Sequence, residues 1–201
     1  MARLNHGNFG LVNASKPLIE RRFPPTTNRS VEHVAQLHGI PLREFWGKTI
    51  LDLGCGLSDL QLGLDRQGIE ATVIGIDLKA LELSRAVGSQ IERNIVAKLG
   101  SLPIPTESID LAIATYSLPH YGSSAEEIDD FFAECKRVVK IGGLLSIAPL
   151  FVNVDLGTDH ITEDFESREL TTQMQVEAIH HSSDWVSTVD WDRGLTALKI
   201  R

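Results

Sequence analysis

The feature of the sequence that most constrains its fold is an apolar run that ends in two closely spaced glycines. The run covers Thr49 to Leu53, the glycines are Gly54 and Gly56, and an amphipathic stretch over 58–67 follows. Where a buried strand turns sharply into a helix, backbone N–H groups at the helix start can face a ligand with no Cβ in the way. The segment therefore predicts a strand, a tight turn and a helix against whose backbone a ligand can lie.

Short apolar runs continue to alternate with amphipathic stretches along the rest of the chain, a pattern typical of an α/β fold with a mainly parallel sheet. The expected strands cover residues 49–53, 71–76, 91–97, 109–115, 144–149, 184–190 and 194–200. The expected helices lie near 58–67, 79–88, 124–140 and 170–179, after a shorter helix that Ser30 caps. Gly142 and Gly143 are expected to end the helix over 124–140 and to turn the chain into its next strand.

The length of the chain limits its domain organisation. A sequence of 201 residues can bury one substantial core and is too short for two ordinary catalytic domains. We therefore expect one ligand-binding domain over residues 47–201 and an N-terminal extension over 1–46. This extension is expected to cap the ligand-binding edge of the sheet.

The charge of the chain bears on its partners. With 27 acidic and 19 basic side chains, the formal net charge is −8, so a polyanion would be repelled and nucleic acid is a disfavoured substrate. The two cysteines, Cys55 and Cys135, have neither disulfide nor metal-ligand spacing. No apolar segment approaches the roughly 20 residues that span a bilayer, and the first ten residues do not read as a signal peptide. We expect a cytoplasmic protein that acts on a small molecule, away from membranes.

A second acidic position indicates what kind of ligand the glycine turn binds. Asp77 follows the expected strand over 71–76, and a carboxylate at that point can accept hydrogen bonds from both hydroxyls of a ribose. A dinucleotide fold would need a small residue where this chain has Asp59, whose charge would oppose a pyrophosphate. Asp52, directly before the turn, instead suits a ligand that carries an amino group and a positive sulfonium.

These residues resemble the class I S-adenosylmethionine-dependent methyltransferases, and the resemblance runs from about Thr49 to Pro149. The similar segments are 52–58 and 75–78 for the first two motifs, 101–114 around the fourth strand, and 135–145 before the fifth. Ser58 replaces the usual third glycine, and Ile141 stands where proline is common. The resemblance implies a Rossmann-like fold with a mainly parallel seven-stranded sheet, helices on both faces and a final antiparallel hairpin. It also implies S-adenosylmethionine as the cofactor.

The resemblance further implies which residues touch that cofactor. The glycine turn would contact the methionine moiety, Asp77 the ribose and Leu78 the adenine face, while Thr115 and Tyr116 would border the methyl group. Lys98 stands where many members have an acid that accepts a hydrogen bond from the adenine amino group, which a lysine cannot do, so Leu99 could contribute through its backbone. The implied cofactor-binding set is Asp52, Gly54, Cys55, Gly56, Ser58, Asp77, Leu78, Leu99, Thr115 and Tyr116.

Candidates for catalysis are fewer, because much of the barrier to methyl transfer can be removed by positioning alone. His120 follows the expected fourth strand and is the candidate general base, with a structural histidine that anchors a loop as the alternative. The acidic segment over 155–166 lacks a supporting ligand spacing, so we expect no metal site.

Three interpretations of function follow from these residues. The leading one is S-adenosylmethionine-dependent methyl transfer to a small molecule. The alternative keeps the fold and the cofactor but replaces the reaction by cyclisation or by a noncatalytic partner role, which fold alone does not exclude. A nicotinamide-dependent oxidoreductase is the third, and Asp59 counts against it.

Overall fold

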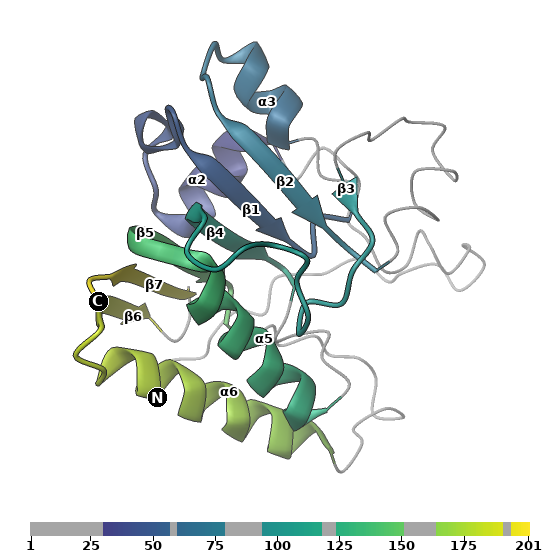
Figure 1. Cartoon of the computed structure of the whole chain (residues 1–201), viewed down its shortest axis with the longest axis vertical. Coiled ribbons are helices and arrows are strands. Elements are labelled where there is room, and N and C mark those ends of the chain that lie inside the picture. The colour runs from purple at the N-terminus through teal and green to yellow at the C-terminus, as the bar shows by residue number, and fades with distance from the viewer. Residues whose placement is uncertain (1–29, 57–59, 79–93, 118–123, 151–163, 191–193) are drawn as a thin grey trace, which may run out of the picture.

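The computed structural model describes residues 30–56, 60–78, 94–117, 124–150, 164–190 and 194–201, with residues 164–168 described by their backbone only. Within these residues seven strands form one sheet in the order β3-β2-β1-β4-β5-β7-β6 (Figure 1). The strands are β1 (Thr49–Leu53), β2 (Thr72–Ile76), β3 (Asn94–Ile95), β4 (Ile109–Thr115), β5 (Val139–Ala148), β6 (Trp185–Asp190) and β7 (Gly194–Lys199).

The directions of the strands confirm the expected architecture. Strands β3, β2, β1, β4 and β5 are parallel, whereas β7 runs antiparallel to both β5 and β6. The order of the strands reverses between β1 and β4, which are neighbours. Ligands of open α/β sheets bind at such a reversal, beyond the carboxyl ends of the strands.

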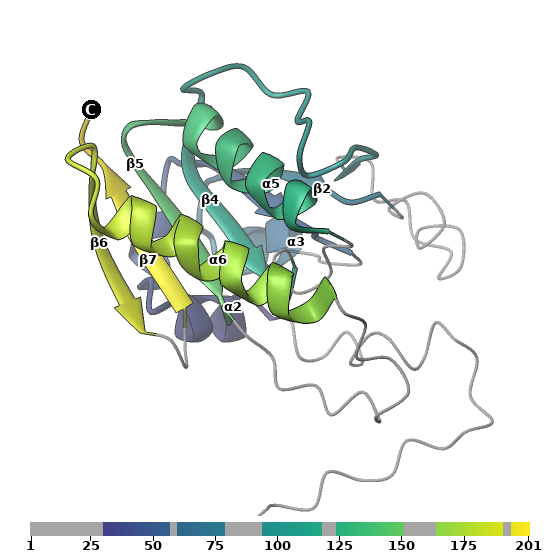
Figure 2. The same cartoon turned by 90° about the horizontal axis from the view of Figure 1, so that it is seen from below.

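Two helices cover one face of the sheet, which we call the apolar face (Figure 2). They are α5 (Ala125–Val138) and α6 (Asp164–His180). Helix α5 begins at Ser124, whose side chain accepts a hydrogen bond from the Glu127 N–H at 3.2 Å, and acidic side chains in its first turn complement the helix dipole. Its fully buried side chains pack on the strands and are Ile128, Phe131, Phe132, Cys135 and Val138.

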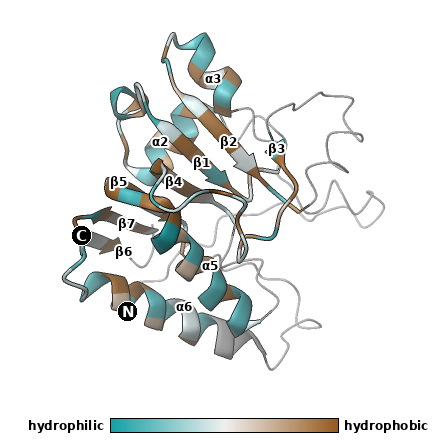
Figure 3. Cartoon of the chain, in the orientation of Figure 1, coloured by the Kyte–Doolittle hydropathy of each residue, from teal (hydrophilic) through white to brown (hydrophobic). Residues whose placement is uncertain are grey.

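The other face, which we call the mixed face, is covered by α2 (Val31–His38) and α3 (Leu60–Arg66). The short 3-10 helix η2 (Leu42–Phe45) follows α2 and buries Phe45 completely in the same cluster as Ile50 and Leu64. Figure 3 shows that the central strands are largely hydrophobic, whereas hydrophilic and hydrophobic residues alternate along the helices that cover them. The segment over residues 30–45 therefore contributes buried side chains to the core, namely Val31, Val34, Ile40 and Phe45.

The prediction of a turn at Gly142 and Gly143 is wrong. Helix α5 ends at Val138 and β5 begins at once, so both glycines lie inside a ten-residue strand. The register of β5 against β4 shifts between Ile109 and Leu111, and a β-bulge absorbs the extra residues there. Gly142 has a φ of +80°, and a Cβ on Gly143 would come within 2.9 Å of the Ile109 carbonyl oxygen. The two glycines therefore serve a bulge.

The other boundaries differ by smaller amounts. Strand β3 has two residues, and Val96 and Ala97 leave the strand that was expected to include them. Helix α6 begins at Asp164, six residues before the expected start. Helix α2 confirms its expected cap, since Ser30 accepts a hydrogen bond from the His33 N–H at 3.3 Å. The helix expected over 79–88 lies outside the described residues.

None of the helices in the described part of the chain combines the length and the apolar composition needed to cross a bilayer.

Candidate functional site

The glycine turn after β1 is joined directly to the end of β2. Gly54 and Gly56 have φ values of +70° and +55°, a region that glycine adopts without the steric cost of a Cβ. The N–H groups of Gly54 and Cys55 both donate to the carbonyl oxygen of Ile76, at 2.7 and 3.1 Å. The turn is therefore held in place by the end of the neighbouring strand.

The chain that leaves β4 packs on the same turn. A Cβ built on Gly54 would lie 1.9 Å from the hydroxyl oxygen of Ser117, which is buried and follows the end of β4. Rotation of the Ser117 side chain would not relieve this clash, because the Ser117 Cβ would still lie only 2.6 Å from the added atom. The carboxyl ends of β1, β2 and β4 thus meet at Gly54, and any larger residue there would push them apart.

Asp77 completes the turn from the end of β2. Its Oδ2 accepts a hydrogen bond from the Gly56 N–H at 3.0 Å, and the side chain is only half-buried. A carboxylate has about four acceptor positions, so one bond to the turn is compatible with further bonds to a ligand. The next residue, Leu78, is 58% exposed and gives this edge an apolar surface.

Asp52 and Cys55 differ from Asp77 because both are buried. Asp52 is the penultimate residue of β1, where it pairs in register with Gly75 and Ile113. A Cβ on Gly75 would lie 2.9 Å from the Cys55 sulfur, which shows that this thiol packs beneath β2. Cys55 could therefore contact a ligand only through its backbone, as the sequence-based assignment requires of this turn.

Strand β4 ends in an uncommon backbone conformation. Tyr116 has a φ of +48°, in the left-handed region that costs a residue with a side chain energy, and its N–H donates to the Ala148 carbonyl at 3.1 Å. Such conformations persist where the surroundings hold them, and they cluster at functional sites. Thr115, the preceding residue, is buried on the mixed face.

A histidine that the sequence analysis did not single out lies beside Thr115. The Nε2 atom of His38 is 2.9 Å from the Thr115 hydroxyl, and its Nδ1 atom is 2.8 Å from the hydroxyl of Ser146 on β5. Burial, with a smaller effect from the charge of His33, lowers the pKa of His38 to about 4. The ring is therefore neutral at pH 7 and binds one hydroxyl as donor and the other as acceptor.

Nothing in the sequence marks His38 as buried. It occupies the last turn of α2 just before the Gly39 cap, where a histidine is normally read as a partner of the helix dipole. Its hydroxyl partners lie 77 and 108 positions away along the chain. Only the folded arrangement brings the three together.

The remaining predicted residues fall in two groups. Ser58 and His120 lie outside the described residues, so their assigned roles stay predictions. Lys98 is exposed, and Leu99 is half-buried and packs against the core of the apolar face. Among the described residues there is no group of three or more His, Cys, Asp or Glu side chains that could hold a metal ion.

A pocket of about 160 Å³ opens at the carboxyl edge of the sheet, between the end of α2 and strands β5, β6 and β7. It is lined by the end of α2, including His38, together with Ser146 of β5, Thr196 of β7, and Thr188 and Asp190 of β6. The described residues that line it include no lysine and no arginine. The Ser146 and Thr196 hydroxyls lie 3.3 Å apart, so this wall is polar without carrying a positive charge.

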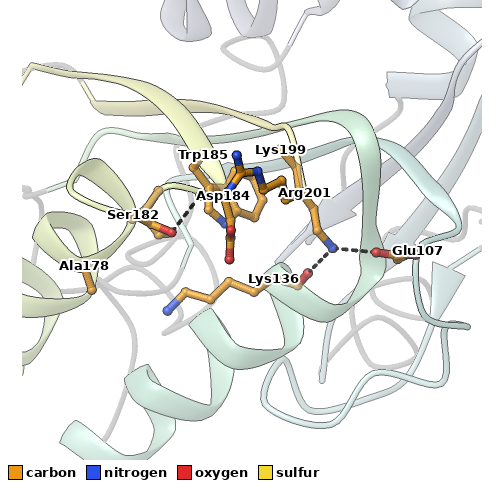
Figure 4. Close-up of a pocket in the computed structure, with 9 residues that line it drawn as sticks. Glu107, Lys136, Ala178, Ser182, Asp184, Trp185, Lys199 and Arg201 are labelled. Carbon is orange, nitrogen blue, oxygen red and sulfur yellow. Dashed lines mark hydrogen bonds and ion pairs between the residues drawn. The ribbon is translucent and has the colours of Figure 1, made fainter.

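A larger pocket of about 360 Å³ lies at the opposite, amino edge of the sheet. Lys199, which lines it, bonds to neighbouring parts of the fold (Figure 4). The Nζ atom of Lys199 donates to the Lys136 carbonyl at 3.1 Å, the Val139 carbonyl at 3.0 Å and the Glu107 carboxylate at 3.1 Å. These bonds satisfy carbonyl groups at the end of α5. The basic side chain therefore holds the fold together, far from the glycine turn.

Comparison with known proteins agrees with the fold and with the motifs. Residues 51–147 match the family model of a methyltransferase domain. The chain is similar to the PH0226 protein from Pyrococcus horikoshii OT3, with a TM-score of 0.53 and 18% identity over 92% of this chain and 100% of that one. It is also similar to a SAM-dependent methyltransferase from Aquifex aeolicus, with a TM-score of 0.51 and 17% identity over 89% and 94% of the two chains.

A third similarity covers a smaller share of the protein compared. The [4+2]-cyclase SpnF is 28% identical with a TM-score of 0.44, over 59% of this chain and 43% of the cyclase, so this chain spans less than half the length of that protein. A search among curated proteins gave no match.

Proposed function

We propose that this chain, whose residues 51–147 form a class I methyltransferase domain with S-adenosylmethionine as its cofactor, transfers the cofactor's methyl group to a small-molecule acceptor. The observation that carries the proposal is the meeting of three strand ends at Gly54, with Asp77 bonded to Gly56 beside them. This arrangement places glycine backbone without side chains and a carboxylate at the reversal of strand order.

The residues at this edge fit S-adenosylmethionine by their chemistry. The turn over residues 54–56 presents backbone with no side chain on either glycine, which suits close contact with the methionine portion. The Asp77 carboxylate suits the ribose hydroxyls, and the acidic side chain of Asp52 suits a cationic group. When bound, the cofactor supplies an electrophilic methyl group on a positive sulfur.

The work of the protein in this reaction is to hold the acceptor in line and to exclude water. The end of β4 is held rigidly by Tyr116 and Ser117, so groups placed there keep a fixed position relative to the turn. An acceptor that must lose a proton would need a base, and His120 remains the proposed candidate.

Charge supports a small molecule as the acceptor. The net charge of −8 and the pocket at the carboxyl edge, which has Asp190 but no lysine or arginine among its described lining residues, disfavour a polyanion. The pocket of about 160 Å³ is smaller than the roughly 300 to 1,000 Å³ of ordinary ligand sites, which favours a small acceptor group.

The test is to measure formation of S-adenosylhomocysteine from S-adenosylmethionine in the presence of separate pools of small metabolites, peptides and RNA. We expect turnover above the acceptor-free rate with small metabolites and none with RNA. Turnover with only peptides or RNA would contradict the acceptor class. Saturable cofactor binding without turnover on any pool would favour the cyclase or noncatalytic alternative.

A further inference from the structure

We infer that His38 is a positioning residue for the cofactor site, and that it holds the carboxyl end of β4 against the glycine turn from helix α2. The inference rests on the proposed function, because it assigns His38 to the same site. His38 lies outside residues 51–147, the stretch that matches the methyltransferase domain.

The first link is the pair of hydrogen bonds made by the imidazole. One nitrogen is 2.9 Å from the Thr115 hydroxyl and the other is 2.8 Å from the Ser146 hydroxyl, and all three residues are buried. Thr115 ends β4 and Ser146 lies near the end of β5, so a single ring fixes α2 to two adjacent strands. Such a tie fixes both spacing and orientation, because each bond is directional.

The second link runs from Thr115 to the turn through two residues. Tyr116 takes up its left-handed conformation immediately after Thr115, with its N–H bonded to the Ala148 carbonyl at 3.1 Å. Ser117 then packs its hydroxyl over Gly54 with no space for a Cβ between them. A shift of Thr115 would therefore be transmitted to the glycine turn within two peptide units.

An imidazole is a poor choice if this position only needs to be filled. Its helix neighbours Val31 and Val34 pack on the same face of the sheet with apolar side chains, and burying a histidine without partners would be costly. Fully bonded polar groups in a core instead select one geometry. The neutral ring has one donor and one acceptor, so it satisfies both hydroxyls at once in either tautomer.

The test compares the affinity for S-adenosylhomocysteine of wild-type protein, His38→Phe and Val34→Ala by calorimetric titration at a temperature where all three are folded. Val34→Ala removes buried apolar contacts from the same helix and serves as the matched control for a general loss of stability. We expect the dissociation constant to rise about three- to thirtyfold in His38→Phe and to change less than about twofold in Val34→Ala.

Thr115→Val and Ser146→Ala extend the test without altering the histidine. If His38 acts through Thr115, the double variant His38→Phe with Thr115→Val will bind no more weakly than His38→Phe alone, because the same link has already been broken. His38→Gln, which keeps one donor and one acceptor, should recover part of the affinity. If His38→Phe does not fold, Ser146→Ala compared with Val34→Ala decides the question, because Ser146 bonds the other ring nitrogen and lies outside the predicted cofactor-binding set.

Equal affinities in His38→Phe and Val34→Ala would overturn the inference and leave His38 as a packing residue. Additive effects of His38→Phe and Thr115→Val would overturn the route through β4. Absence of saturable binding to the wild-type protein would overturn the proposed function itself, and the two failures are therefore distinguishable.

Discussion

The two faces of the sheet are stabilised differently. On the apolar face, α5 and α6 pack aliphatic and aromatic side chains on the strands, and Phe131 meets Phe132 edge to face with ring centroids 5.3 Å apart. On the mixed face, α2 and α3 also cover apolar residues, but His38 bonds to the ends of β4 and β5 there. Apolar packing sets how stable the fold is, whereas directional bonds near the carboxyl edge set where the strand ends lie.

The largest expected change in the free energy of unfolding comes from a substitution on the apolar face. Phe131→Ala should lower the free energy of unfolding by about 3 to 5 kcal/mol, because the side chain is fully buried and its removal leaves a cavity. Denaturation by urea measures this loss. The affinity of the remaining folded protein for S-adenosylhomocysteine should stay as in the wild type, and a tenfold weaker affinity would show that this face also shapes the site.

The mixed face differs from the apolar face because its buried His38 should make the stability of the fold depend on pH. The folded-state pKa of His38 is about 4 and its ordinary value is 6.5, so between these pH values the unfolded chain binds the extra proton. Stability should therefore be complete above pH 6.5 and fall as the pH drops towards 4, by about 1.4 kcal/mol per pH unit and about 3 kcal/mol in all.

His38→Gln should remove this contribution, so the comparison is the difference between the unfolding free energies of the two proteins at several pH values from 7.5 to 4.5. That difference should shrink as the pH falls, although carboxylates such as Asp110 and Glu134, whose pKa values are lowered, destabilise both proteins in acid. Parallel pH profiles would mean that folding leaves the pKa of His38 unchanged, and would contradict its burial as a neutral ring.

The glycine turn, where the ends of three strands meet, should respond differently from a glycine elsewhere. Gly54→Ala and Gly142→Ala both place a Cβ on a left-handed residue, at a cost of about 1 to 2 kcal/mol. Position 142 has open space, whereas position 54 has the Ser117 hydroxyl at 1.9 Å. Only Gly54→Ala should therefore weaken cofactor binding, by about tenfold or more. Equal binding by both variants in calorimetry would contradict the close approach of β4.

The smallest effect is expected for a polar contact on the outside of the mixed face. The Gln67 amide donates to the Glu32 carboxylate at 2.5 Å and joins α3 to α2, but both side chains are exposed to water. Gln67→Ala should change the unfolding free energy by less than about 0.5 kcal/mol in urea denaturation. A loss above 1 kcal/mol would mean that surface polar contacts also hold α2 in place.

The sequence predicted most of the fold because the signals are local. The apolar runs over 49–53 and 109–115 are now β1 and β4 with unchanged bounds, and the periodicity near 124–140 is α5. The bulge in β5 could not be predicted, since adjacent glycines look like a turn until pairing with β4 draws them into a strand.

The sequence predicted those site residues that belong to a motif and missed the one that does not. The glycine turn and Asp77 lie together as their spacing indicated, because the carboxyl ends of neighbouring parallel strands share one edge. His38 was missed because its partners become neighbours only through the packing of α2 on β4 and β5. Pairwise contacts at such separations leave no pattern in a single sequence.

The most direct test of the central claim is calorimetric titration of S-adenosylhomocysteine into wild-type protein, Asp77→Asn and Asp110→Asn. Asparagine at 77 can still accept the Gly56 hydrogen bond but loses the carboxylate, while Asp110 bonds to Lys140 and the Thr49 N–H at the amino edge and is the matched control. We predict saturable wild-type binding, about ten- to hundredfold weaker binding by Asp77→Asn, and unchanged affinity in Asp110→Asn. Equal affinity in all three proteins would contradict a cofactor site at the carboxyl edge.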